Sequence, residues 1–195
     1  MSAPGQEPGP GGTRASAGFD DEADRWLVGR ARAGDRGAYE ELVRRHRDRI
    51  YRIALRMLGS PADADDVAQE VVIQLWTAMS GFAGTSAFTT WLYRVVVNRC
   101  LNHRRSQRPH DELADVDHPC VAGPESRVLA GEELQAGLRA ISGLPEDQRV
   151  SLVLVQLEGL SYREAAVVTK TSEATVRGRL ARARATLMSE MKDWT

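Results

Sequence analysis

Four arginines crowd the C-terminal end of the chain, and their chemistry suits a nucleic acid. Arg177, Arg179, Arg182 and Arg184 lie within eight residues of one another. Planar guanidinium groups bind phosphates and the acceptor edge of guanine. A solvated basic face on an amphipathic helical hairpin would contain the same residues. From this segment alone, a DNA-binding helix and a helix with a solvated basic face are therefore about equally well supported.

A second basic segment runs from residue 88 to residue 109 and contains no aspartate or glutamate. Its arginines are accompanied by hydroxyl and amide side chains, which hydrogen-bond to phosphates and bases. The absence of acids favours a nucleic-acid surface over a merely solvated cationic face. The residues concerned are Thr89, Thr90, Arg94, Asn98, Arg99, Asn102, Arg104, Arg105 and Arg108.

An acidic cluster precedes that segment, at the expected start of a helix. It consists of Asp63, Asp65, Asp66, Gln69 and Glu70. Carboxylates near a helix N-terminus stabilise it by roughly 0.3–1 kcal/mol each. Four carboxylates so close together also repel one another. Binding to a basic partner is therefore a second explanation for the cluster. Composition does not choose between the two.

No residue pattern indicates catalysis or a cofactor. The chain has no nucleophile–base constellation, phosphate-binding loop or metal-ligand spacing. Cys100 and Cys120, with His103, His110 and His118, fit no familiar zinc pattern and are interpreted as scattered residues. We therefore expect no catalytic residues, no metal and no cofactor.

Composition predicts an all-α protein of one or two small domains. The chain has 195 residues, of which 42% are hydrophobic and only 6% aromatic, and its net charge is -1. Alternating β patterns are few, so helices are favoured over sheets. No apolar run approaches the roughly 20 residues of a membrane span, and the N-terminus lacks the apolar core of a signal peptide. We therefore expect a cytoplasmic protein.

Hydrophobic spacing and stop signals divide the chain. Residues 1–21, rich in Gly, Pro, Ala and Ser, are predicted to be a disordered tail. A short helix should end at Gly34, and a longer one should follow from Asp35 to Gly59. Further helices are predicted at about 62–79, with Ile73 and Trp76 on its apolar side, and after a cap at Ser86. The first domain would then span 22–109, the linker 110–124, and the second domain 125–195.

The second domain is predicted to end in a helix-turn-helix motif. After helices at about 125–141 and 145–159, Ser161 and Glu164 form a capping box. Ser172 caps the next helix, whose apolar face is Val176, Leu180, Ala183 and Leu187. A short helix, a tight turn and a longer basic helix match the motif that enters the major groove of DNA.

Taken in order, these segments resemble the extracytoplasmic function group of bacterial sigma factors, in the sigma-70 superfamily. The resemblance covers about residues 35–191. The core helices of the sigma-2 domain correspond to AYEELVRRHRDRIYRIALRMLGSPADADDVAQEVVIQLW, and the −10 recognition helix to FTTWLYRVVVNRCLNHRRSQRP. The sigma-4 domain corresponds to LPEDQRVSLVLVQLEGLSYREAA and TSEATVRGRLARARATL.

The resemblance implies roles for these residues. The acidic helix, through Asp65, Asp66, Gln69 and Glu70, would dock on the β′ clamp helices of core RNA polymerase, and the β flap is a further implied contact. The loop at about 82–87 would capture a flipped base of the promoter. Implied −10 contacts are Phe82, Ser86, Thr89, Thr90, Arg94, Asn98, Arg99, Arg104 and Arg105. Implied −35 contacts are Ser172, Glu173, Thr175, Arg177, Arg179 and Arg182. The family also implies an anti-sigma factor.

The chain departs from the family pattern at the turn of the helix-turn-helix. Lys170 stands where relatives usually have glycine, and a positive φ there costs an L-residue roughly 1 kcal/mol. Thr169 and Thr171 replace apolar neighbours, which predicts a less tightly packed turn. The alternative function is a stand-alone helix-turn-helix regulator, which would leave the acidic helix and the 88–109 surface without a role.

Overall fold

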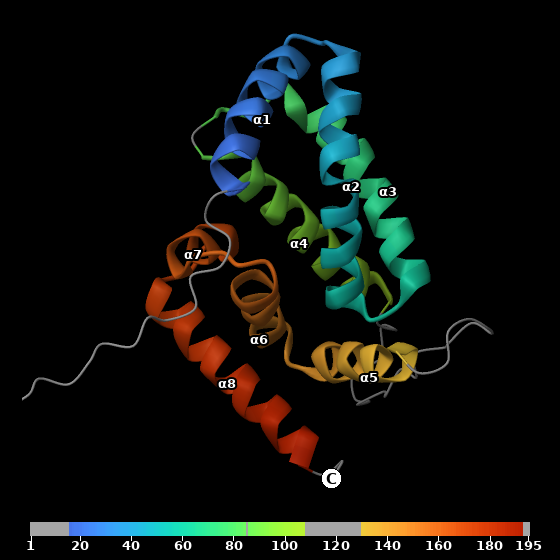
Figure 1. Cartoon of the computed structure of the whole chain (residues 1–195), viewed down its shortest axis with the longest axis vertical. Coiled ribbons are helices and arrows are strands. Elements are labelled where there is room, and N and C mark those ends of the chain that lie inside the picture. Colours follow the sequence, from blue (N-terminus) through green and yellow to red (C-terminus); the bar gives the residue numbers. More distant parts are fainter. Residues whose placement is uncertain (1–15, 85, 108–129, 193–195) are drawn as a thin grey trace, which may run out of the picture.

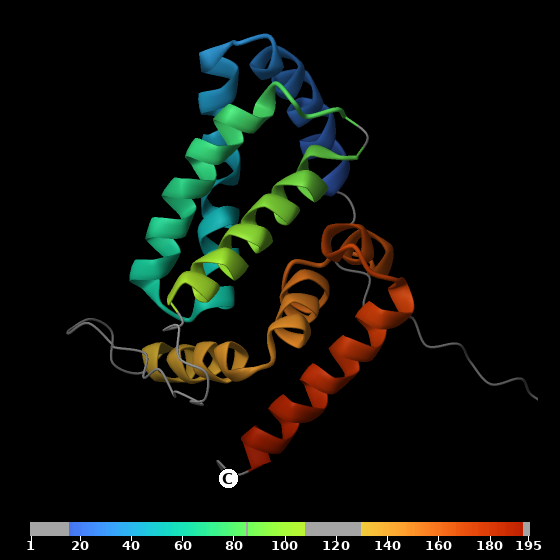
Figure 2. The same cartoon turned by 180° about the vertical axis from the view of Figure 1, so that it is seen from behind.

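The secondary structure is entirely helical in the residues that the structure, a computed structural model, describes, namely 16–84, 86–107 and 130–192. Figures 1 and 2 show two groups of helices, an N-terminal domain (residues 16–107) above a C-terminal domain (residues 130–192). The whole of the predicted linker and most of the predicted N-terminal tail lie outside the described residues. The helices are α1 (Ser16–Arg32), α2 (Arg36–Leu58), α3 (Pro61–Met79), α4 (Phe88–Gln107), α5 (Ala130–Gly143), α6 (Glu146–Ser151), the π-helix η1 (Leu152–Leu157), α7 (Tyr162–Thr169) and α8 (Glu173–Lys192).

The N-terminal domain is organised around α2, which packs against α1, α3 and α4. Spacings of three and four residues along α2 predict one apolar stripe of eight residues. The structure confirms it, since Val43 is partly buried and the other seven members are buried, namely Tyr39, Leu42, His46, Ile50, Ile53, Ala54 and Met57. Asp35 caps the helix by accepting the Ala38 amide at 3.0 Å. Gly59 ends it in the left-handed conformation, with φ of 76°. The stripe therefore supplies one buried seam that holds the other three helices in place.

Three local predictions differ from the structure. Helix α1 begins at Ser16, well before the predicted start at residue 22, because extending a nucleated helix costs little. Ala87, not Ser86, precedes α4, and its carbonyl accepts the Trp91 amide. Ile73 was predicted to lie on the apolar side of α3, but it is 66% exposed. Its position on the helix turns it away from the seam formed by Val67, Val71 and Leu75.

The C-terminal domain brings the helix-turn-helix onto a small apolar core. Leu144, Leu152, Leu180 and Ala183 form one buried cluster that joins α8 to the preceding helices. The segment predicted as one helix over 145–159 changes character midway, because the α-helix gives way to the π-helix η1 at Leu152. The Glu158 amide there bonds to the Val153 carbonyl, five residues back. Such wide turns are uncommon and have no sequence signature of the kind that caps have.

The turn of the helix-turn-helix matches its prediction closely. Ser161 and Glu164 form the complete capping box, and Ser172 accepts the Thr175 amide at 3.1 Å. Lys170 has φ 54° and ψ 42°, in the left-handed region. The neighbouring threonines satisfy their hydroxyl groups locally, since Thr169 donates to the Ala165 carbonyl at 2.7 Å and lies 3.0 Å from the Thr171 hydroxyl.

Replacing Lys170 by glycine should raise the free energy of unfolding by up to about 1 kcal/mol. Glycine removes the steric cost of a left-handed L-residue, although it loses more backbone entropy on folding. The matched control is Ala181→Gly, at an exposed position inside α8. This change should lower the free energy of unfolding by about 1 kcal/mol. Urea denaturation followed by circular dichroism measures both changes. A loss of stability in Lys170→Gly would mean that the lysine side chain makes a contact worth more than the strain.

The two domains contact each other through α2 and α4 on one side and α5, η1 and α7 on the other. Arg149 of α6 donates to the Met57 carbonyl at the end of α2, at 2.8 Å. Glu158 lies between Arg52 and Arg56 of α2. A Cβ placed on Gly59 would come within 2.9 Å of the Ser142 Cβ, so glycine is also what allows α5 to approach this closely.

Candidate nucleic-acid and polymerase interface

The exposed side of α8 presents most of the residues predicted to read the −35 element. Ser172, Glu173, Thr175, Arg177 and Arg182 are all exposed. The Ser172 and Thr175 hydroxyls lie 2.9 Å apart, so the first turn of the helix is held in place locally. The Arg177 guanidinium lies over the Tyr162 ring of α7, at 4.9 Å from its centroid. This arrangement joins the recognition helix to the supporting helix while leaving its polar face open.

Arg179 lies on a different side of α8 from the other candidates. It forms an ion pair with Asp147 of α6 at 2.9 Å, and its side chain is only 23% exposed. Arg184 is exposed but also has a protein partner, since it donates to the Gln156 side chain. Both arginines link α8 to the helices behind it. The sequence alone did not separate them from Arg177 and Arg182, because the partners come from distant segments.

Helix α4 carries the second basic surface, and its candidates divide by burial. Asn98 and Arg105 are exposed, while Thr89, Arg94, Arg99 and Arg104 are partly exposed. Thr90 is buried, because it lies on the side of α4 that packs into the core. That position leaves Thr90 little surface from which to contact DNA, and we drop it from the set of proposed −10 contacts.

Three arginines of α4 already have protein partners. Arg94 donates to the Val167 carbonyl of α7 at 3.1 Å. Arg99 is paired with Glu70 of α3 at 2.5 Å, so a predicted DNA contact is bound to a predicted polymerase contact. Arg105 lies 3.5 Å from Glu146 of α6. In this conformation, part of the positive charge of α4 is therefore used within the protein.

The far end of α4 is attached to the start of α3 by a polar cluster. Asp63 accepts hydrogen bonds from His103 and Gln107, each at 3.1 Å. Burial alone would raise the pKa of Asp63, but these hydrogen bonds outweigh it and lower the pKa. Nearby Cys100 is buried, which raises the pKa of its thiol to about 12. His110, His118 and Cys120 lie outside the described residues, and within those no cluster of metal-binding side chains occurs.

The loop before α4 borders a pocket of about 380 Å³. Phe82 is buried and packs on Trp91 and Phe88, with ring centroids 4.9 Å and 6.2 Å away. Ser86, which does not cap α4, lines the same pocket. The two residues predicted for base capture, Phe82 and Ser86, are thus brought together at one hollow. The aromatic packing also fixes where α4 begins.

The exposed side of α3 combines carboxylates with apolar side chains. Asp65, Asp66 and Gln69 are exposed, and Glu70 is partly exposed beside Arg99. Ile73 and Trp76 continue the surface along the helix, and Trp76 is 40% exposed although it packs edge-on against Tyr39 at 4.8 Å. An exposed apolar patch next to acidic groups is typical of a protein-binding surface. The apolar half of this surface has no signal in the sequence, because Ile73 and Trp76 look like core residues.

Comparison with known proteins identifies both halves of the chain. Residues 42–110 match the model of Sigma-70 region 2, and residues 134–187 match that of Sigma-70, region 4. The RNA polymerase sigma-H factor of Pseudomonas aeruginosa is 38% identical over 176 residues, which cover 84% of this chain and 91% of that protein. The chain belongs to the sigma-70 family, in its extracytoplasmic function group. The ECF RNA polymerase sigma-E factor of Escherichia coli K12 is 36% identical, with 83% of this chain and 90% of that protein covered.

Two solved structures have a similar arrangement of helices. CnrH, in complex with the cytosolic domain of CnrY, matches with a TM-score of 0.69 and 29% identity over 89% of this sigma factor and 99% of CnrH. The sigma factor RpoE of Bartonella quintana, bound to the anti-sigma factor NepR, matches with a TM-score of 0.62 at 21% identity. The match covers 79% of this chain and 96% of that one. At this identity it supports the fold alone. Within the described residues, no helix is both long and apolar enough to cross a membrane.

Proposed function

We propose that this sigma factor binds core RNA polymerase and directs it to promoters through two DNA-reading helices. Its exposed α3 surface would dock on the β′ clamp helices, with the β flap as a second contact. Helix α8 would read the −35 element through Ser172, Glu173, Thr175, Arg177 and Arg182. The loop at 82–87 and helix α4 would bind the −10 element and help to open it. The protein would act in the cytoplasm, as a specificity subunit without chemistry of its own.

The observation that supports this proposal most is the separation of the charged surfaces. Carboxylates and exposed apolar groups lie on α3, whereas exposed cationic and hydroxyl groups lie on α4 and α8. A protein that bound DNA alone would have no use for the α3 surface. The sigma factor RpoE of Bartonella quintana is bound to the anti-sigma factor NepR in its solved structure, and we propose a partner of that kind for this chain as well.

Reconstituted transcription tests the proposed function directly. Purified chain is added to core RNA polymerase, and promoters are selected from a library randomised at the −35 and −10 elements. We expect transcripts from a narrow set of promoters only when the chain is present. A stand-alone regulator would instead bind duplex DNA without polymerase and give no selected transcripts. That result would contradict the proposal.

The double substitution Asp66→Ala and Gln69→Ala should weaken binding to core polymerase about tenfold, which corresponds to roughly 1.4 kcal/mol. Both side chains are exposed, so we expect the fold to be kept. The matched control is Asp48→Ala, at an exposed carboxylate on α2. Fluorescence anisotropy of labelled chain with core polymerase measures the affinity. Unfolding of the double variant, seen by circular dichroism, would instead give the cluster a structural role.

A further inference from the structure

The pocket beside the loop at 82–87 has a second wall, formed by residues for which the sequence predicts no role. Helix α1 supplies that wall through Arg25, Val28, Gly29 and Arg32. The other wall comes from the loop and from Phe88 at the start of α4. Figure 1 shows α1 running alongside this loop, at the edge of the N-terminal domain. Its cationic residues therefore stand at the same hollow as the residues proposed for base capture.

The two walls have the chemistry that an unstacked nucleotide needs. Phe82, Phe88 and Val28 form an apolar floor, which suits the face of a base. A Cβ placed on Gly29 would meet no atom within 4 Å, so the absence of a side chain leaves space over that floor. Arg32 is exposed at the end of α1, and no acidic group within the described residues pairs with it. A cation beside an aromatic floor fits a base and its phosphate.

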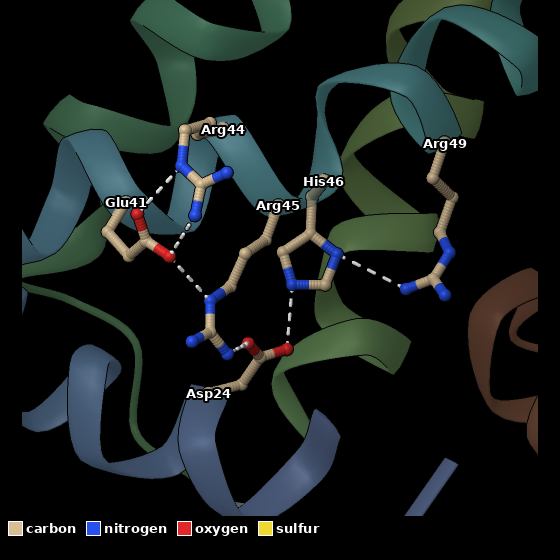
Figure 3. A network of polar contacts seen from close by, with 6 residues as sticks. All are labelled: Asp24, Glu41, Arg44, Arg45, His46 and Arg49. Atoms are coloured by element: carbon tan, nitrogen blue, oxygen red, sulfur yellow. Dashed lines mark hydrogen bonds and ion pairs between the residues drawn. The ribbon is translucent and has the colours of Figure 1, made fainter. Parts of the chain in front are cut away.

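A buried polar network fixes the position of α1. Asp24 of α1 and His46 of α2 are both buried, and His46 Nε2 lies 2.7 Å from a carboxylate oxygen of Asp24 (Figure 3). Arg49 donates to His46 Nδ1 at 3.2 Å, so Nε2 carries the proton that points at Asp24. The other Asp24 oxygen faces Arg45 at 3.7 Å.

The same network reaches the floor of the pocket. The His46 ring packs against Phe88, with 5.3 Å between the ring centroids. One histidine therefore contacts both α1, through Asp24, and the aromatic floor. A single buried group thus links the two walls of the pocket.

We propose that α1 forms part of the −10 recognition site, with Gly29 leaving room for an extruded base and Arg32 binding an adjacent phosphate. This inference rests on the proposed function and extends it to a helix outside the region 2 match, which begins at residue 42. Asp24 and His46 act as positioning residues, since they set the wall without facing the nucleotide. The ligand is a single-stranded deoxynucleotide segment.

Filling the pocket from α1 tests the steric half of the proposal. Gly29→Leu places a side chain over the floor at a helical, exposed position, so the fold should be kept. The matched control is Gly137→Leu on α5, where a Cβ also meets nothing within 4 Å. Holoenzyme is assembled on a selected promoter that carries 2-aminopurine, a fluorescent adenine analogue, at each −10 position in turn.

We expect one position to brighten on promoter opening with the wild-type chain and with Gly137→Leu. Gly29→Leu should lose that signal and open the promoter about tenfold less, because pocket contacts must offset the cost of unstacking. Binding to core polymerase should stay unchanged. An unchanged signal in Gly29→Leu overturns the role of α1 alone. If the wild-type chain neither binds polymerase nor opens the promoter, the proposed function itself fails, and the inference fails with it.

The charge half of the proposal is tested by salt dependence. Removing one phosphate contact should lower the slope of log affinity against log salt by about 1. Arg32→Ala should show this change for holoenzyme binding to a promoter fragment that is single-stranded across the −10 element. Arg47→Ala, at an exposed position on α2, is the control and should keep the wild-type slope. Equal slopes for all three proteins would overturn the phosphate contact.

Discussion

Replacing Arg149 by glutamine should lower the free energy of unfolding by about 3 kcal/mol or more, since it breaks several charge-assisted hydrogen bonds at once. Arg149 is 1% exposed, and its guanidinium donates to the carbonyls of Ile141, Met57 and Leu144 at 3.0, 2.8 and 2.6 Å. It also donates to the Ser142 carbonyl. Glutamine is shorter and offers fewer donors, so most of these buried carbonyls would be left without a partner.

The matched control for that change is Arg163→Gln, at an exposed position on α7. Urea denaturation should show a large loss in the free energy of unfolding for Arg149→Gln. For the control, that free energy should change by no more than about 0.5 kcal/mol. Because the Met57 carbonyl belongs to the N-terminal domain, the loss should include a weaker attachment between the domains. A small effect at Arg149 would mean that water replaces the guanidinium among these carbonyls.

Most of the fold followed from signals that act within a few residues. The seam of α2, the capping box of α7 and the left-handed Lys170 each depend on local spacing or on one backbone position. The family resemblance is likewise confirmed over both matched regions. Local hydrogen bonds and helical periodicity determine these features, so a single sequence is sufficient to predict them.

Contacts between distant segments could not be predicted in the same way. Nothing near Arg149 indicates that its partners include Met57, and nothing near Thr90 marks that hydroxyl as buried. Ile73 was misplaced because an apolar residue on a helix reads as core, whatever face it occupies. The contribution of α1 to the pocket also depends on the packing of a helix against a loop some fifty residues away. In all four cases the role of the residue or helix depends on burial and on tertiary partners, which the local sequence does not indicate.

Glu158 carries a buried carboxylate that faces the other domain. Its side chain is 2% exposed and lies 2.5 Å from Arg56 and 3.3 Å from Arg52, both on α2. Burial raises the pKa of Tyr93 to about 12, so this α4 hydroxyl keeps its proton and can donate to Glu158 at 3.4 Å. The carboxylate thus joins η1 to two helices of the N-terminal domain. A neutral side chain would leave the two arginines without their shared counter-charge.

Substituting Glu158 by glutamine should weaken the closed contact between the domains by about 2 kcal/mol, less than for a fully buried pair because Arg52 is half exposed. That corresponds to about a thirtyfold shift toward separated domains. Spin labels on Asp48→Cys and Arg163→Cys, with Cys120→Ser to remove the other thiol, should show longer distances. Cys100 is buried and its raised pKa disfavours labelling. Glu40→Gln, an exposed carboxylate on α2, is the control.

Separation of the domains should also change how the free chain binds DNA. Arg94 and Arg105 of α4 are held by the Val167 carbonyl and by Glu146 only while the C-terminal domain stays in place. Once released, both can bind phosphates, so Glu158→Gln should bind single-stranded DNA more tightly than wild type and with a steeper salt dependence. Unchanged distances together with unchanged DNA affinity would show that Glu158 supports its own domain and does not hold the two domains together.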